Sequence, residues 1–318
     1  MDFYEDIQHI GEGGQGTCSL VRRCRDSQLL VLKTIPKPKY SQGLPIDIRI
    51  LRDLLPTHKR IASLANSCIF PDRTELFLEF CDGGDLQDLI DQYDDHATKI
   101  PESFLWHAFI QLSEALAFLH YGWNLEDHGP ITRSTAPWKR IIHRDIKPAN
   151  VFLKFRTHHH WLSGYPDLKL GDFGLAAVTS DPDHTADSYC GTYAWQPPER
   201  PEATAKGDVW ALGAIIHALA HDGHPPLSDP PPSRPWLAPC GTVGWDELPR
   251  ARQPTSVIGA YSPTLDRWMM KCFRRKPTQR VTSMELVTEM APVGRRKMMR
   301  QWWPLRRWAF DGLNDIAD

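Results

Sequence analysis

The chain has 318 residues, of which 41% are hydrophobic and 24% are charged, and its formal net charge is −2. This composition is typical of a folded protein with a sizeable core, and the length suits a two-lobed unit or two packed domains. The near-neutral charge excludes the strongly basic class that binds nucleic acid or anionic membranes through its overall charge. We therefore do not expect nucleic acid as a partner. No membrane span is expected either, because no apolar run approaches the roughly 20 residues that one needs.

The cysteines and the first residues bear on cellular location. The seven cysteines are scattered without a C-x-x-C pair, which predicts free thiols in a reducing compartment rather than a disulfide framework or a zinc site. The first ten residues are acidic and lack the basic and apolar regions of a signal peptide. These features predict a cytoplasmic or nuclear location, or both.

The first quarter of the chain predicts short strands. Residues 20–23, 29–34 and 75–80 are apolar or β-prone, and turn-forming glycines flank them. A short helix is expected over 46–55, and Pro56 is expected to end it.

From about residue 85 the pattern becomes helical. Apolar residues over 104–119 follow the helical period of about 3.6 residues, and Ser103 is expected to cap the start. Further helices are expected over 209–219, 261–273 and 281–290, and insertions over 122–139, 156–166 and the proline-rich 224–254. Strands followed by helices predict an α+β fold of two lobes with a cleft between them.

The segment 11–16 is a G-x-G-x-x-G motif. By itself this motif also fits a dinucleotide fingerprint or a flexible turn. A dinucleotide site needs a helix directly after the glycines, whereas residues 17–23 predict a strand. We therefore expect a loop between two strands, whose backbone N–H groups can approach the phosphates of a nucleotide.

Two further segments indicate phosphoryl transfer. They are the sequence HRDIKPAN at 143–150 and the sequence DFG at 172–174, and both match the protein-kinase signature. Lys33 at the end of an apolar strand adds a cation that an anion or carboxylate must balance.

These residue types supply what phosphoryl transfer requires. Asp145 can orient the attacking hydroxyl and accept its proton, and Lys147 can meet the moving phosphate. Asn150 and Asp172 offer the hard oxygen ligands that Mg²⁺ prefers. Lys33 and the glycine loop can hold ATP.

With these motifs the chain resembles the eukaryotic protein kinases of the Ser/Thr type over residues 4–291. The resemblance implies an N-lobe at about 4–81 and a C-lobe at about 82–291, followed by a basic and aromatic tail at 292–318. The segments 143–153 (HRDIKPANVFL) and 79–86 (EFCDGGDL) look most like the NIMA-related kinases. ATP, Mg²⁺ and a protein substrate are the implied cofactors and partner.

The resemblance assigns the nucleotide site. Leu78 matches the gatekeeper, Glu79 and Cys81 match the hinge that bonds adenine, and Asp85 lies where an acid often approaches the ribose. The residues expected to bind the nucleotide are Ile10, Gly11, Glu12, Gly13, Gly14, Gln15, Gly16, Thr17, Cys18, Val31, Lys33, Leu78, Glu79, Cys81 and Asp85.

The resemblance also implies internal supports. Glu199 is expected to pair with Arg280, and Asp208 to brace the catalytic loop. Leu51, His143 and Phe173 are expected to stack in one internal hydrophobic spine.

Lys147 and the Gly191-Thr192 pair favour Ser/Thr over Tyr, because a threonine in that substrate loop bonds the catalytic aspartate. Arg144 before the catalytic aspartate implies control by phosphorylation of the activation segment. Ser188 is the expected site, and an upstream activating kinase the implied partner.

The sequence departs from the family pattern at the helix acid that pairs with Lys33. The pattern places this acid at Asp47, which is one methylene shorter than the usual glutamate. The pair forms if the helix moves inward by about 1.5 Å, the length of one bond. A pseudokinase scaffold is the alternative that this departure supports. A small-molecule kinase is a third hypothesis, against which the nearly complete activation segment at 172–199 argues.

The tail interleaves basic residues with tryptophans. Such a pattern also fits nucleic acid or a membrane surface. We expect instead a closing helix whose tryptophans cover the large lobe.

Overall fold

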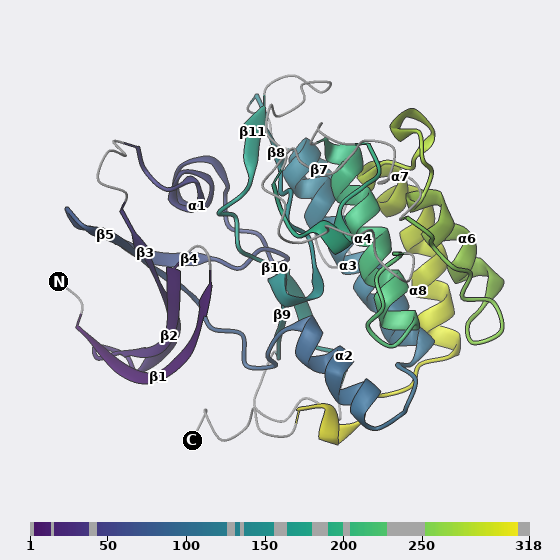
Figure 1. Cartoon of the computed structure of the whole chain (residues 1–318), viewed down its shortest axis with the longest axis horizontal. Helices are drawn as coiled ribbons and strands as arrows, with labels where there is room; N and C mark the ends of the chain where they lie inside the picture. The colour runs from purple at the N-terminus through teal and green to yellow at the C-terminus, as the bar shows by residue number, and fades with distance from the viewer. Residues whose placement is uncertain are drawn as a thin grey trace.

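A computed structural model gives the structure of the chain. It describes residues 3–13, 16–37, 43–125, 131–133, 137–155, 164–179, 190–199, 204–227 and 252–310. Figure 1 shows a strand-rich N-terminal lobe beside a larger lobe built mainly of helices. This arrangement confirms the predicted two-lobed α+β fold.

The N-terminal lobe is a five-stranded antiparallel sheet in the order β1-β2-β3-β5-β4. Its strands are β1 (Tyr4–Gly13), β2 (Gly16–Arg23), β3 (Gln28–Pro36), β4 (Leu64–Ile69) and β5 (Arg73–Glu79). Because β1 and β2 form a hairpin, the glycine-rich segment joins two strands, as the sequence predicts. The register sets Lys33 of β3 opposite Cys18 of β2 and Leu76 of β5.

The helix expected over 46–55 has an irregular form. It begins as the short α1 (Ile46–Ile48) and continues as wider π-helical turns over Arg49–Leu54. Leu55 is extended, as a residue before proline usually is. Ile48 and Ile50 are fully buried, so this element is fixed by its packing on the sheet and the large lobe.

The large lobe is organised around two buried helices, α3 (Glu102–Tyr121) and α4 (Ala205–Ala220). Nearly every residue of both is buried, which is typical of helices in the centre of a lobe. Around them lie α2 (Leu86–Asp95), α6 (Pro263–Cys272), α7 (Ser283–Glu285) with π-helical turns at Leu286–Met290, and α8 (Ala291–Arg300).

The start of α3 differs from the prediction. The residue at the N-cap is Pro101, and Ser103 lies inside the first turn. The Ser103 hydroxyl is instead 2.6 Å from the Tyr165 hydroxyl and accepts the Trp303 N–H. A partner distant in sequence has therefore taken the hydroxyl that would otherwise cap the helix.

Short strands carry the catalytic segments between the lobes. β9 (Val151–Lys154) pairs with β10 (Asp167–Leu170), and β8 (Arg140–Ile142) pairs with β11 (Ala177–Thr179). A third pair joins β6 (Trp123–Leu125) and β7 (Ile131–Arg133). The β6–β7 pair lies in the insertion expected over 122–139, whereas the insertions expected over 156–166 and 224–254 fall largely outside the described residues.

The tail packs against the large lobe, but only part of it is covered. Trp308 stacks on His96, and Phe310 meets Phe155 edge to face. Trp302 and Trp303 remain 46% and 58% exposed. The expectation that the tryptophans cover the lobe is therefore right for Trp308 and wrong for the other two.

Candidate active site

A cavity of about 400 Å³ lies between the two lobes. Its volume is in the range of small-molecule sites. Of the residues expected to bind nucleotide, those that line it are Ile10, Cys18, Val31, Lys33, Leu78, Glu79, Cys81 and Asp85. The cavity thus gathers the ends of β1, β2 and β3 with the segment that joins β5 to α2.

Some expected residues do not line this cavity, and some lining residues were not expected. Gly11, Glu12, Gly13, Gly16 and Thr17 lie in the hairpin outside it, whereas Gly14 and Gln15 are outside the described residues. Lining residues that sequence reasoning missed are Ala62, Leu76, Asp82, Gly84, Asp88, Phe152 and Gly171. Phe152 lies in β9, two residues after Asn150, and both side chains line the cavity.

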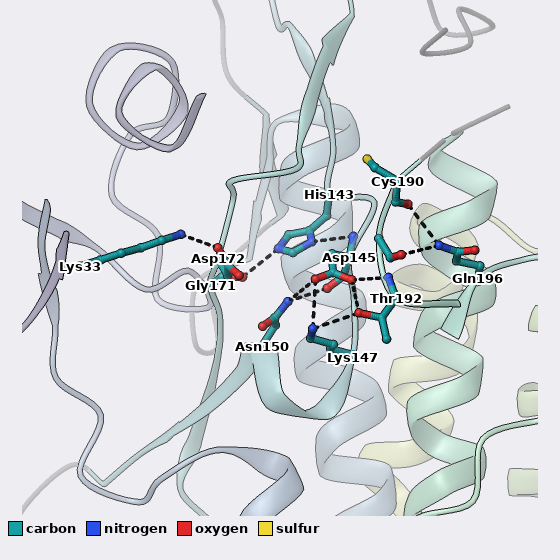
Figure 2. A network of polar contacts seen from close by, with 11 residues as sticks. Lys33, His143, Asp145, Lys147, Asn150, Gly171, Asp172, Cys190, Thr192 and Gln196 are labelled. Carbon is teal, nitrogen blue, oxygen red and sulfur yellow. Dashed lines mark hydrogen bonds and ion pairs between the residues drawn. The ribbon is translucent and has the colours of Figure 1, made fainter. Parts of the chain in front are cut away.

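Lys33 links two carboxylates at the inner end of the cavity. Its Nζ lies 2.9 Å from Asp47 Oδ2 and 2.7 Å from Asp172 Oδ1. The shorter aspartate therefore reaches Lys33, and the ion pair that the sequence left open is present. Figure 2 shows Lys33 pointing at Asp172 from the small lobe.

Burial and charge act in opposite directions on this triad. Burial raises the pKa of the Asp47 carboxyl, even though the Lys33 ammonium opposes it. For Asp172 burial also favours the neutral form, but the charge and hydrogen bond of Lys33 outweigh it and lower the pKa. For Lys33 burial acts to lower the pKa, and the two carboxylates reverse this and raise it. The charges within the triad therefore favour the ionised forms of Lys33 and Asp172, whereas burial raises the pKa of Asp47.

Asp145 is the centre of a hydrogen-bonded network. Its Oδ1 accepts the Thr192 N–H at 2.7 Å and the Thr192 hydroxyl at 2.8 Å. Lys147 Nζ lies 3.3 Å from Asp145 Oδ2 and donates to the Thr192 hydroxyl at 3.0 Å. The Asn150 amide nitrogen donates to Asp145 Oδ2 and to its backbone carbonyl, at 3.1 and 2.8 Å (Figure 2). The bond between the threonine and the aspartate is thus present as expected.

Asp208 supports the loop that carries Asp145 through backbone hydrogen bonds. Asp208 at the start of α4 accepts the backbone N–H groups of His143 and Arg144, at 2.8 and 3.0 Å. His143 contacts Phe173, with 5.0 Å between ring centres, and its Nε2 donates to the Gly171 carbonyl at 2.9 Å. Arg144 and Asp172 adopt left-handed backbone angles, φ 70° and 58°. Such strained non-glycine conformations cluster at functional sites.

The end of the activation segment is tied to the large lobe. Arg280 is fully buried, and its Nη2 donates to Glu199 Oε2 at 2.8 Å, so the expected ion pair is present. Arg144 Nε donates to the Leu175 carbonyl at 2.5 Å. Ser188, the expected phosphorylation site, lies outside the described residues.

The comparisons with known proteins agree with this geometry. The family model described as "Protein kinase domain" matches residues 4–290. Serine/threonine-protein kinase Nek2 of Mus musculus is 30% identical over 228 residues, which cover 69% of this chain and 46% of that protein. G2-specific protein kinase fin1 of Schizosaccharomyces pombe is 32% identical over 236 residues, covering 71% of this chain and 31% of that protein.

A more distant relative is aligned over more of the chain. Mitogen-activated protein kinase kinase 1 of Arabidopsis thaliana is 26% identical over 289 residues, which cover 89% of this chain and 72% of that protein. By contrast, the chain spans less than half the length of the Nek2 and fin1 proteins that it matches. Among the described residues, no helix combines the length and apolar character that a bilayer crossing requires. On its sequence match, its two lobes and the network around Asp145, this chain belongs to the protein kinase domain family.

Proposed function

We propose that the chain transfers the γ-phosphate of Mg²⁺-bound ATP to serine and threonine hydroxyls of protein substrates. The observation that carries this proposal is the convergence of two groups of residues. Asn150 lines the nucleotide cavity together with Lys33 and Asp172, and the same amide donates to Asp145. One side chain thus connects the nucleotide cavity to the carboxylate that would meet the substrate hydroxyl.

The residues present fit a magnesium ion. The Asn150 amide nitrogen is used by Asp145, which leaves the amide oxygen as the ligand atom. Asp172 offers a carboxylate that Lys33 keeps ionised. Two oxygen ligands from the protein suffice, because Mg²⁺ usually keeps several waters and binds substrate phosphates. Bound there, the ion would neutralise charge on the phosphates.

The remaining residues would position the reactants. Asp145 would orient the substrate hydroxyl and accept its proton, while Lys147 would stabilise charge on the transferred phosphate. Lys33 would hold the nucleotide phosphates, and Asp47 would hold Lys33 in place. Leu78, Glu79 and Cys81 would enclose the adenine.

The test compares wild type with Asp145→Asn in an assay with labelled ATP and a generic protein substrate. Loss of the carboxylate should lower the turnover by about three orders of magnitude, because positioning and charge stabilisation supply most of the rate. The melting temperature should change little, and ATP with Mg²⁺ should raise it in both proteins by mass action. Near wild-type turnover in Asp145→Asn would show that another group is the base.

Control by an upstream kinase is part of this proposal. A phosphate on Ser188 would add about −1.5 to −2 charge, which the guanidinium of Arg144 could bind bidentately. We expect phosphatase treatment to lower the activity of wild type and to leave Ser188→Ala unchanged at a low level. Thr185→Ala is the matched control in the same segment. Full activity of protein whose Ser188 is unmodified by mass spectrometry would contradict this regulation.

A further inference from the structure

Arg252 is a buried arginine that the catalytic network does not use. It is only 2% exposed, although arginine is rarely buried without partners. The residue lies between α4 and α6, where it forms an antiparallel bridge with Leu227. The Gln253 N–H also donates to the Pro226 carbonyl at 3.1 Å. The backbone around Arg252 is therefore anchored to the segment that follows α4.

The Arg252 guanidinium holds both ends of one short turn. This turn, η4 (Tyr193–Trp195), follows Thr192 directly. Arg252 Nη2 donates to the Tyr193 carbonyl at 2.6 Å, and Nε donates to the Gln196 carbonyl at 2.7 Å. The guanidinium carbon also lies 4.6 Å from the centre of the Tyr193 ring. One planar group thus fixes where the turn begins and where it ends.

The other side of the same turn is tied to the catalytic aspartate. Gln196 Nε2 donates to the Gly191 carbonyl at 2.7 Å and to the Cys190 carbonyl at 3.3 Å (Figure 2). Gly191 has a φ of 101°, and a Cβ there would lie 2.2 Å from the Arg144 carbonyl oxygen. The loop from Cys190 to Gln196 therefore lies directly against the catalytic loop.

This loop must also face the substrate. Thr192 makes two hydrogen bonds to Asp145, so any hydroxyl that reaches Asp145 brings its neighbouring residues against η4. We propose that Arg252 is a positioning residue for the protein substrate, because its two hydrogen bonds fix the position and orientation of η4 beside Asp145. This inference rests on the proposed kinase activity and names one of the residues that would determine protein-substrate affinity.

The contacts predict which kinetic constant changes. Among the described residues that line the nucleotide cavity, none belongs to η4 and none is Arg252. A change at Arg252 should therefore act on the protein substrate and spare ATP. Loss of both donors would leave the Tyr193 carbonyl with the Gln196 N–H alone and would remove the Arg252 donor from the Gln196 carbonyl, which would allow the turn to shift. A shift of about 1 Å at a substrate-positioning element can cost up to about 100-fold in rate.

The experiment measures steady-state kinetics of Arg252→Met against one peptide substrate and against ATP. Methionine keeps much of the side-chain length but cannot donate. We expect the KM for the peptide to rise about ten-fold or more, with the KM for ATP within about two-fold of wild type. Arg252→Lys should restore part of the peptide affinity, because one ammonium can reach one carbonyl but lacks the planar fork.

Arg23→Met is the matched control. Arg23 is also largely buried, 9% exposed, and bonds Asp26 in the small lobe, so its loss should lower the melting temperature without a change in peptide KM.

An unchanged peptide KM in folded Arg252→Met, or equal rises in both KM values, would overturn the proposal. If Arg252→Met does not fold, Arg252→Lys decides, because wild-type peptide KM in that variant would assign Arg252 to stability alone. Failure of wild type to phosphorylate any peptide would instead overturn the proposed function.

Discussion

At the scale of single residues, Asp47 is where this chain departs from its family. The side chain is 2% exposed, and its Oδ2 lies 2.9 Å from Lys33 Nζ. Within the described residues its other oxygen, Oδ1, is buried without a hydrogen-bond partner. The short acid thus contacts Lys33 from α1 itself, before the π-helical turns begin. The departure therefore leaves the ion pair intact.

Asp47→Asn should lower the turnover by about ten-fold or more, because an amide holds Lys33 less firmly on the nucleotide phosphates. Steady-state kinetics with saturating ATP would measure this. Asp47→Glu is the companion variant, and its extra methylene must be placed where Asp47 Oδ2 already lies 2.9 Å from Lys33 Nζ. We expect it to lower the free energy of unfolding by about 1–3 kcal/mol without raising activity. Higher turnover in Asp47→Glu than in wild type would show that the aspartate limits the activity of the site.

At the scale of elements, α8 joins the tail to the large lobe. The helix lies along α3, as Figure 1 shows. Arg295 of α8 donates to Glu114 at 2.8 Å, and Glu114 also accepts from the buried Arg60 at 2.9 Å. A Cβ on Gly294 would lie 2.7 Å from the Trp106 ring. The close approach of the two helices therefore depends on this glycine.

Gly294→Ala should destabilise the protein although alanine is the better helix former. The added methyl must displace the buried Trp106, and overpacking of this kind outweighs the gain of about 1 kcal/mol in helix propensity. We expect the melting temperature to fall by a few degrees. Gly43→Ala serves as control, because a Cβ there would meet nothing within 4 Å and should leave stability almost unchanged. A rise in the melting temperature of Gly294→Ala would mean that α8 is not packed on Trp106.

At the scale of the whole molecule, two buried histidines couple stability to pH. Burial lowers the pKa of His217 to about 4 and the pKa of His58 to about 3. His217 accepts the Thr255 N–H through Nε2 at 3.1 Å, so its Nδ1 proton is the one that bonds the His224 carbonyl. Protonation of Nε2 would break the first of these bonds.

The free energy of unfolding should therefore fall with acid. For a base with a lowered folded-state pKa, the stabilisation is complete above the unfolded-state value of about 6.5 and is lost as pH falls towards 4. The part due to His217 amounts to about 3 kcal/mol at most. Denaturant unfolding at pH 7 and pH 5 would measure it in wild type and in His217→Gln, which removes the titration. Equal pH slopes in the two proteins would contradict this assignment.

The sequence by itself determined the parts of the fold and site that depend on local order. Local patterns of a few residues predict the glycine-rich turn, the strands beside it and the helix over 104–119. The two motifs at 143–150 and 172–174 place their functional groups at fixed short spacings. For that reason the two lobes and the catalytic loop could be predicted, whereas Leu78, Glu79, Cys81 and Asp85 of the cavity were assigned from the resemblance to protein kinases.

Only the tertiary structure decided the contacts between segments distant in sequence. Lys33 and Asp47 meet at 2.9 Å because the fold brings α1 next to β3, and the sequence left this contact open because the acid is one methylene shorter than the usual glutamate. Ser103 lies inside the first turn of α3, and its hydroxyl meets Tyr165 and Trp303 from other parts of the chain. Arg252 reaches the turn at Tyr193 from 59 residues away. Contacts of this kind form through the packing of the whole lobe, and no residue spacing within one segment predicts them.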